Sequence, residues 1–237
     1  MPPWLTHAYY ACRRALIFFT RYPLPPLTSR SARADLMLAD AAWALPLVGI
    51  LAAAPAALAL LLPEPLGVWL ALALLLLTSG ALHEDGWADV WDASGGATRE
   101  RRLAILKDSR VGSYGVLALG VLLLVRWQGL TEASPLQLLA IAALSRGLVA
   151  FTFRNRWQLG GGLAARVGTL SLSQGLLLGA QLLLLLLLLP PAAWLLALLA
   201  VLLMALWLKR LLGGFNGDGY GAMIIAAELA AWGGLLL

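Results

Sequence analysis

The chain consists of apolar segments so long and so closely spaced that they leave no room for a sizeable soluble domain. Of its 237 residues, 61% are hydrophobic and 12% are charged, whereas soluble domains carry about 25% charged residues. This composition cannot cover a water-facing surface with polar groups, so it predicts an integral membrane protein. Each segment must satisfy its own backbone hydrogen bonds in lipid, and is therefore expected to be a helix. We predict an all-α, polytopic helical bundle that forms one domain over residues 1–237.

About seven segments are expected to cross the membrane, several of them shorter than the ~20 residues that a bilayer requires. They cover residues 41–62, 67–82, 111–125, 136–153, 173–189, 192–208 and 221–237. Residues 1–40 are expected to form a cytoplasmic or interfacial segment, in which the apolar stretch 15–19 is too short to span. The first residues lack a charged region followed by an apolar run, so no cleavable signal peptide is expected.

The basic residues predict the orientation of the chain. With a cytoplasmic N-terminus, the cytoplasmic loops hold 15 of the 17 Lys and Arg residues, and cytoplasmic loops are enriched in these residues. Arg126 is then expected on the opposite side and Arg146 inside the fourth segment. The basic residues form no water-facing stripe, so the net charge of +5 does not indicate nucleic-acid binding. The single cysteine, Cys12, excludes an intramolecular disulfide.

The most unusual stretch is Leu82–Asp92, which gathers one histidine and four carboxylates at the end of an apolar segment. Asp85, Asp89 and Asp92 are spaced i, i+4 and i+7, so they share one face of a helix. A divalent cation would remove the repulsion between them, and oxygen ligands suit Mg²⁺ or Mn²⁺. The three aspartates are therefore candidate metal ligands. The alternative is a solvated acidic end of a helix.

Further candidates flank this acidic stretch. His83 is a candidate general base, metal ligand or hydrogen-bond donor to phosphate, with a structural role as the alternative. Glu84 is expected to point away from the aspartate face. Thr98 is expected to cap a helix that begins at Arg99. The stretch Lys107–Arg110 follows, and cations beside an acidic metal site are what a polyphosphate substrate requires. Lys107 and Arg110 are therefore candidate catalytic cations. For Arg99, Arg101 and Arg102 the alternatives to substrate contact are a topology signal or binding of lipid head groups.

A second candidate site is the loop 213–221, which has five glycines in nine residues and lets the backbone approach a ligand closely. Asp218 stands where the last helix is expected to begin, and is a further candidate metal ligand. Arg146 and Glu228 lie inside apolar segments, where charges normally face the protein interior. A mutual ion pair and contact with substrate both remain open for them. The candidate substrate-binding residues are Arg21, Asp108, Ser109, Arg146, Asn216 and Asp218.

The stretches Gly80–Asp92 and Arg99–Gly115 together resemble the signature of the cobalamin synthase family, H-x-D-G-x-x-D-x-x-D followed by K-D-S-R-x-G-x-x-G. The resemblance extends to Thr20–Pro23 (T-R-x-P), Pro46–Gly49 (P-x-x-G) and Gly217–Ala222 (G-D-x-x-G-A), and so to nearly the whole chain. Glu228 stands where a family glutamate is expected. Two positions depart from the pattern: Ala81 replaces a second glycine, and Ile225 stands where a further acidic residue is expected.

Members of this family are adenosylcobinamide-GDP ribazoletransferases. The resemblance implies a Mg²⁺-dependent reaction of adenosylcobinamide-GDP with α-ribazole or its 5′-phosphate, giving adenosylcobalamin or its 5′-phosphate and GMP. The expected partners are these two substrates and the lipid bilayer, with a homo-oligomer left open. The expected location is the cytoplasmic (inner) membrane, with the site loops facing the cytoplasm.

Two other functions are compatible with aspartates at a membrane boundary. A CDP-alcohol phosphotransferase also displaces a nucleotide, but its D-G-x-x-A-R pattern is not matched, since Asp85-Gly86 is followed by Trp87-Ala88-Asp89. A cation transporter would place its charges near mid-membrane. Here Lys and Arg beside the acidic loop would repel an incoming cation.

Overall fold

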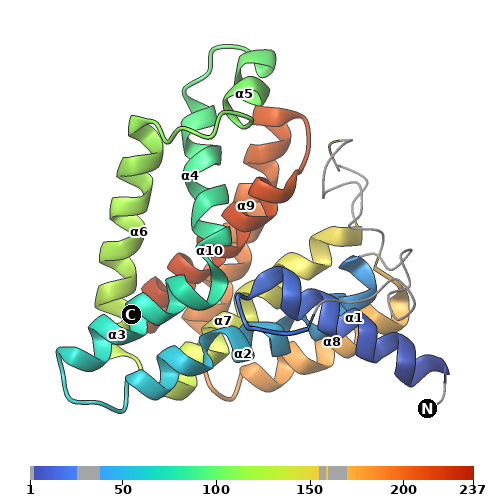
Figure 1. Cartoon of the computed structure of the whole chain (residues 1–237), viewed down its shortest axis with the longest axis vertical. Coiled ribbons are helices and arrows are strands. Elements are labelled where there is room, and N and C mark those ends of the chain that lie inside the picture. Colours follow the sequence, from blue (N-terminus) through green and yellow to red (C-terminus); the bar gives the residue numbers. More distant parts are fainter. Residues whose placement is uncertain (1–2, 26–37, 155–158, 160–169) are drawn as a thin grey trace.

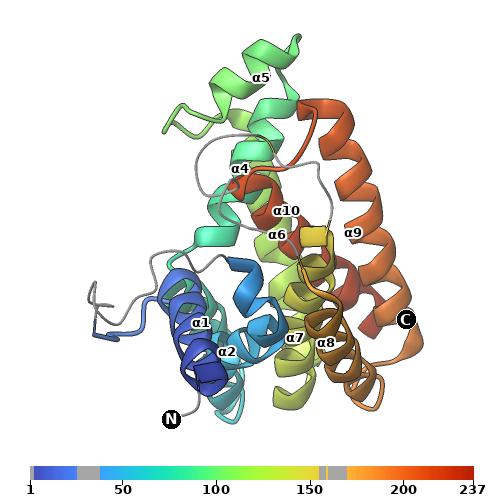
Figure 2. The same ribbon diagram turned by 90° about the vertical axis from the view of Figure 1, so that its right-hand side faces the viewer.

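The computed structural model describes residues 3–25, 38–154, 159 and 170–237, and within these ranges the chain is helical and contains no strand. The elements are α1 (Pro3–Phe19), the 3₁₀ helix η1 (Leu38–Ala44), α2 (Leu45–Ala59), α3 (Leu66–Ser79), α4 (Leu82–Ser94), α5 (Arg99–Ile105), α6 (Ser113–Glu132), α7 (Pro135–Ala150), the 3₁₀ helix η2 (Phe151–Arg154), α8 (Leu172–Leu185), α9 (Pro191–Leu212) and α10 (Gly217–Leu235). The short helix α5 lies at one end of the longest axis, and α1, α2 and α8 lie toward the other (Figures 1 and 2).

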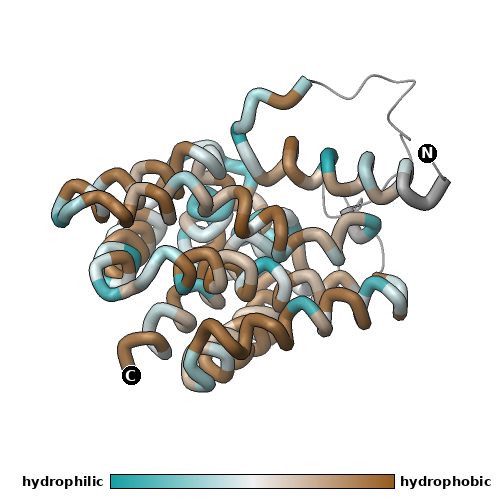
Figure 3. Tube along the Cα trace, turned by 90° about the horizontal axis from the view of Figure 1, so that it is seen from below, coloured by the Kyte–Doolittle hydropathy of each residue, from teal (hydrophilic) through white to brown (hydrophobic). Residues whose placement is uncertain are grey.

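Four stretches of helix in the described residues are long and apolar enough to cross a membrane, namely Asp40–Ala59, Ser113–Glu132, Pro135–Phe153 and Pro191–Leu212. Helices α3 and α4 pass the same test only as a pair, which is bent by 84°, and α8 is a shorter apolar helix. Hydrophobic residues line nearly all of the helices (Figure 3). The predicted all-helical, membrane-protein character is confirmed, whereas the predicted count of seven spans is not.

The difference in count has local causes. The predicted span 67–82 is a 14-residue helix that ends at a sharp turn, and 173–189 is also a 14-residue helix. Helix α10, over the predicted span 221–237, is rich in Gly and Ala and carries two acidic residues, which lowers its hydropathy. The short stretch 15–19 proves to be the end of a 17-residue helix, α1. Parts of the predicted loops 1–40 and 154–172 lie outside the described residues.

Side-chain caps set several helix ends. Ser134 with Gln137, and Ser171 with Gln174, form capping boxes at the starts of α7 and α8, in which side chain and backbone satisfy each other's free groups. The predicted cap at Thr98 is confirmed, because its hydroxyl accepts a hydrogen bond from the Arg101 N–H at 3.2 Å. These polar caps fix where α5, α7 and α8 begin.

Helix α10 is the central element and packs against α4, α6, α7 and α9. Most of its residues are buried on all sides, including Met223, Ile225 and Trp232. Glycines allow the close approaches: a Cβ on Gly129 of α6 would overlap the Trp232 ring. Small residues serve in this way where helices pack in membranes, because they let two backbones come together.

A buried group of charges crosses the centre of the bundle. Arg126 is 3% exposed in α6, and its guanidinium binds Glu228 of α10 and Glu84 of α4. The predicted end of the third segment at residue 125 is wrong, because α6 continues to Glu132 and Arg126 lies inside this helix. Glu228 forms its ion pair with Arg126. The ion pair between Glu228 and Arg146, which was one of the two open alternatives, is not formed. Arg126, in the middle of α6, therefore supplies the positive charge that neutralises Glu84 and Glu228.

Candidate active site

The acidic stretch forms α4, whose start is fixed by a sharp turn after α3. Gly80 has φ 62° and Ala81 has φ 55°, so both are left-handed. This conformation costs an alanine about 1–2 kcal/mol, which explains why a glycine would suit position 81. Arg21 lies over the turn: its N–H donates to the Thr78 carbonyl at 2.7 Å, and a Cβ on Gly80 would overlap its side chain. The turn thereby brings Arg21, a candidate substrate-binding residue, close to the first turn of α4.

Three carboxylates lie together where α4 meets the beginning of α10. Asp85 and Asp89 are one turn apart on α4, and Asp218 is in the first turn of α10. A Cβ on Gly86 would lie 2.8 Å from the Cα and the carbonyl oxygen of Asp218, so the two backbones touch at this glycine. The negative charges of Asp85, Asp218 and Asp92 all act on Asp89. Two motifs far apart in the sequence therefore build one acidic surface.

Asn216 orients Asp218 within this surface. Its Oδ1 accepts a hydrogen bond from the Gly219 N–H at 2.9 Å and so caps α10, while its Nδ2 donates to Asp218 Oδ2 at 2.6 Å. Burial raises the pKa of Asp218, the hydrogen bond from Asn216 opposes this, and the charge of Asp85 raises the pKa further. Both residues were predicted as part of one site, and the structure brings them into direct contact.

The three carboxylates fit Mg²⁺ by their chemistry and exposure. Among the described residues, no group of three or more His, Cys, Asp or Glu side chains is arranged so that it could hold a metal ion by itself. Mg²⁺ does not need one, because it keeps several waters and binds through one or two carboxylates together with substrate phosphates. Asp85 is exposed, and Asp89 and Asp218 are half-buried. Their oxygens are therefore accessible to a hydrated cation.

Asp92, the third predicted ligand on α4, has a different set of contacts. Its two carboxylate oxygens accept hydrogen bonds from the Gly112 N–H at 2.7 Å and the Gly115 N–H at 2.8 Å. These donors belong to the first turn of α6, where a negative charge also interacts favourably with the helix dipole. Asp92 thus ties the end of α4 to the start of α6, and its oxygens are less free for a metal than those of Asp85 and Asp89.

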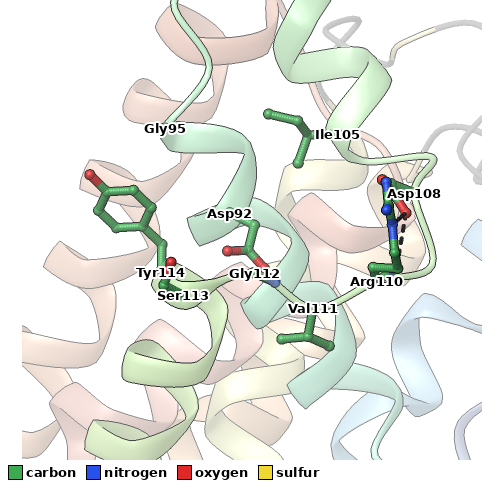
Figure 4. Close-up of a pocket in the computed structure, with 9 residues that line it drawn as sticks. All are labelled: Asp92, Gly95, Ile105, Asp108, Arg110, Val111, Gly112, Ser113 and Tyr114. Carbon is green, nitrogen blue, oxygen red and sulfur yellow. Dashed lines mark hydrogen bonds and ion pairs between the residues drawn. The ribbon is translucent and has the colours of Figure 1, made fainter.

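A pocket of about 480 Å³ opens beside Asp92. Figure 4 shows the Asp92 carboxylate between the Tyr114 ring and the paired side chains of Asp108 and Arg110. The remaining lining is Gly95, Ile105, Val111, Gly112 and Ser113. The pocket combines apolar side chains with an exposed ion pair, and it adjoins the helix that carries the acidic surface.

The predicted cations follow α5 on an exposed loop. Lys107 is exposed, and the Arg110 side chain is 86% exposed. Arg110 Nη2 binds Asp108 Oδ2 at 2.7 Å, and hydrogen bonding to Arg110 lowers the pKa of Asp108 to about 2. Ser109 is exposed beside them. Asp108 therefore holds Arg110 at the pocket.

Two arginines of the short basic helix, Arg99 and Arg102, join α5 to the end of α9. Arg99 Nε donates to the Leu212 carbonyl at 2.7 Å, and Arg102 Nη1 donates to the Leu211 carbonyl at 3.2 Å. Helix ends leave such carbonyls without partners, and cations there are favourable. These bonds place the loop after α4 next to the loop that precedes α10. Their only sequence signal was their position in a short basic helix.

His83 lies on the buried side of α4. Its side chain is 2% exposed, stacks on Phe19 with ring centroids 5.7 Å apart, and has no hydrogen-bond partner at Nε2. Arg146, also predicted as a substrate contact, is 7% exposed and bonds the Ala142 carbonyl of its own helix. Both residues face the buried charges around Arg126 rather than the exposed acidic surface.

Comparison with known proteins gives a consistent result. A family model described as Cobalamin-5-phosphate synthase matches residues 11–236. A relative from Mesorhizobium japonicum is 40% identical over 91% of this chain and 88% of its own length. Relatives from Azorhizobium caulinodans (39% identical; 94% and 94%) and Shewanella amazonensis (36%; 94% and 93%) are also similar. All three are named adenosylcobinamide-GDP ribazoletransferase. No solved structure matches the chain.

Proposed function

The chain belongs to the Cobalamin-5-phosphate synthase family, and from this premise we propose that it joins adenosylcobinamide-GDP to α-ribazole or its 5′-phosphate and releases GMP. Its relatives carry the name of a transferase, so the chain is a transferase of cobalamin synthesis. The proposal adds the substrates and the residues that handle them. The observation that carries it is the contact of α4 with α10 at Gly86, which brings Asp85 and Asp89 together with Asp218. The pocket that holds Arg110 opens beside Asp92 on the same helix.

Asp85, Asp89 and Asp218 are proposed to hold Mg²⁺ against the pyrophosphate of the GDP-linked corrinoid. When bound, the ion would neutralise charge that develops on the departing GMP. Asn216 keeps Asp218 in place through its 2.6 Å hydrogen bond, and Asp92 keeps the start of α6 against α4. This division of roles follows from which carboxylates are accessible.

The basic side chains are proposed to bind the remaining phosphate oxygens. Lys107 and Arg110 are exposed on the loop after α5, and cations fixed near a phosphoryl group stabilise charge in the transition state. Arg21, over the turn before α4, and Ser109 are proposed as further substrate contacts. Arg146 is buried and bonded to its own helix, which favours a structural role for it.

The chemical step forms a bond from the ribazole hydroxyl oxygen to the phosphorus on the corrinoid side, and breaks the bond from that phosphorus to GMP. The hydroxyl proton must go to a group that substrate can reach. His83 is 2% exposed, so a carboxylate of the acidic surface is the better acceptor, and Asp85 is the most exposed of the three. We assign the proton to Asp85.

The proposed orientation has the N-terminus and the active site on the cytoplasmic side of the inner membrane. The distribution of 15 of the 17 basic residues supports it, since Lys and Arg favour cytoplasmic loops. The bonds from Arg99 and Arg102 to the end of α9 add support. They require the loops 95–98 and 213–216 to lie on one side of the membrane.

The test uses the purified protein in detergent with Mg²⁺, and follows nucleotide release. We expect GMP from adenosylcobinamide-GDP with α-ribazole, and no CMP from CDP-linked alcohols. Asp89→Asn should lower turnover by about 100-fold or more, as loss of one transition-state charge contact does. Glu100→Gln, an exposed carboxylate on α5, is the matched control, and its turnover should be unaffected.

Normal turnover by folded Asp89→Asn would remove Asp89 from the site. Robust Mg²⁺ flux in liposomes, without GMP release, would favour a transporter instead.

A further inference from the structure

Arg126 joins three helices through one buried guanidinium. Its Nε and Nη2 bind the two oxygens of Glu228 at 2.7 and 3.2 Å, and its Nη1 binds Glu84 Oε1 at 2.5 Å. The side chains of Arg126, Glu84 and Glu228 are 3%, 6% and 8% exposed. Helix α6 thus holds the first turn of α4 and the middle of α10 at the same time.

Stability alone does not explain this cluster. Removing charges from water is costly, and replacing a buried ion pair by apolar residues is often neutral or stabilising. The second oxygen of Glu84, and Nε of the nearby Arg146, have no hydrogen-bond partner among the described residues. Such groups are expensive to bury. What a planar, forked guanidinium does supply is a fixed geometry between two carboxylates.

The two helices that Arg126 holds are the ones that form the acidic surface. They touch at Gly86, over the Asp218 backbone, and at Gly221, where a Cβ would lie 3.3 Å from the His83 Cα. Glu84 is adjacent to Asp85 in the chain, and Glu228 is on the same helix as Asp218. A change in how α4 crosses α10 would therefore change the distance between Asp85 and Asp218 directly.

We propose that Arg126 is a positioning residue, which sets the crossing of α4 and α10 and so keeps Asp85 and Asp89 beside Asp218 at the Gly86 contact. This inference rests on the proposed function, because it takes those three carboxylates as the Mg²⁺ site. Arg126 itself is buried away from substrate and takes no part in the chemical step.

The test is Arg126→Lys, which keeps the charge but loses the fork that binds both carboxylates. The measurements are kcat per folded molecule and the Mg²⁺ concentration that gives half-maximal GMP release. We expect that concentration to rise about tenfold and kcat to fall about tenfold. Such a loss follows when a site is displaced by a fraction of an ångström. Arg210→Lys, an exposed arginine in the last turn of α9, is the matched control and should change neither value.

A purely structural role predicts something different, namely less folded protein but a wild-type Mg²⁺ dependence for the molecules that fold. That outcome would overturn the proposal. If Arg126→Lys does not accumulate, Glu228→Gln replaces it, since the amide oxygen still accepts from Arg126 while the charge is lost. It should shift the Mg²⁺ dependence in the same direction. Failure of both variants to fold would show that the cluster serves stability, which also overturns the proposal.

The same experiment separates this proposal from the proposed function. Asp89→Asn is assayed beside the Arg126 variant. If Asp89→Asn is inactive and Arg126→Lys behaves as wild type, only the positioning role fails. If Asp89→Asn is fully active, the carboxylate site itself fails, whatever Arg126→Lys does.

Discussion

The contact between Gly86 and Asp218 gives the sharpest test of the site, through the substitution Gly86→Ala. The added Cβ would lie 2.8 Å from two Asp218 backbone atoms, whereas an ordinary contact begins at 3.4 Å, so the two backbones must separate by roughly 0.6 Å. Overpacking of this kind costs about 1–3 kcal/mol, and alanine returns about 0.5–1 kcal/mol through its better helix propensity. We expect a net loss of about 1 kcal/mol.

The effect on turnover should be larger than the effect on stability. A net loss of about 1 kcal/mol lowers the Tm of a protein of this size by about 2–4 °C. A displacement of 1 Å in a catalytic site can cost about 100-fold in rate, so 0.6 Å corresponds to roughly tenfold. The assays are GMP release per folded molecule, and the fraction of monodisperse protein that remains after heating in detergent.

Gly120→Ala is the control for this substitution. Gly120 is in the interior of α6, and a Cβ there would meet nothing within 4 Å. It should gain about 0.5–1 kcal/mol from helix propensity and keep wild-type turnover. If Gly86→Ala had wild-type turnover and an unchanged or higher Tm, the close approach of α4 to the Asp218 backbone would be refuted as a requirement of the site.

Three further outcomes are expected. Asp92→Asn leaves one oxygen to accept hydrogen bonds from the N–H groups of Gly112 and Gly115, so it should lower the free energy of unfolding by about 1–3 kcal/mol. It should also speed trypsin cleavage after Arg110, and unchanged cleavage would contradict the role given to Asp92. Removal of divalent cations by EDTA should abolish GMP release and added Mg²⁺ should restore it, while activity that survives exhaustive chelation would argue against the metal. The pKa of Asp108 falls from 3.8 to about 2 in the folded protein. The contribution of its pair with Arg110 to the stability of the fold is therefore fully present above about pH 4 and is lost as the pH falls through 2. An NMR titration of this carboxyl with a midpoint near 4 would be inconsistent with the pairing.

Much of the site could be predicted from sequence because its signals are local. The spacing of Asp85 and Asp89 places them on one helix face in any α-helix. Thr98 shows its capping role through the helix-forming residues that follow it. The charge asymmetry of the loops placed the two acidic motifs on one side, and the structure brings them into contact at Gly86.

The remaining features depend on contacts between segments distant in the sequence. Hydropathy alone ends the third apolar segment at Val125 and so predicts Arg126 outside it, whereas the ion pairs with Glu84 and Glu228 let α6 carry this charge in the protein interior. Helix α10 was counted as a span although its small residues serve packing rather than lipid contact. The hydrogen bonds of Asp92 with Gly112 and Gly115 cannot be predicted from helix periodicity, because they join two different helices.

The contact between α4 and α10 also sets the order in which the protein can mature. Asp89 and Asp218 are 129 positions apart in the chain. At a synthesis rate of about 5–20 residues per second, roughly 6 to 26 s pass between the appearance of one carboxylate and that of the other. During this interval the Gly86 face of α4 is uncovered, and from its own synthesis Arg126 has only Glu84 as a partner until Glu228 follows 102 positions later. The proposed Mg²⁺ site therefore cannot form until α10 has been made, and we expect activity only from the complete bundle.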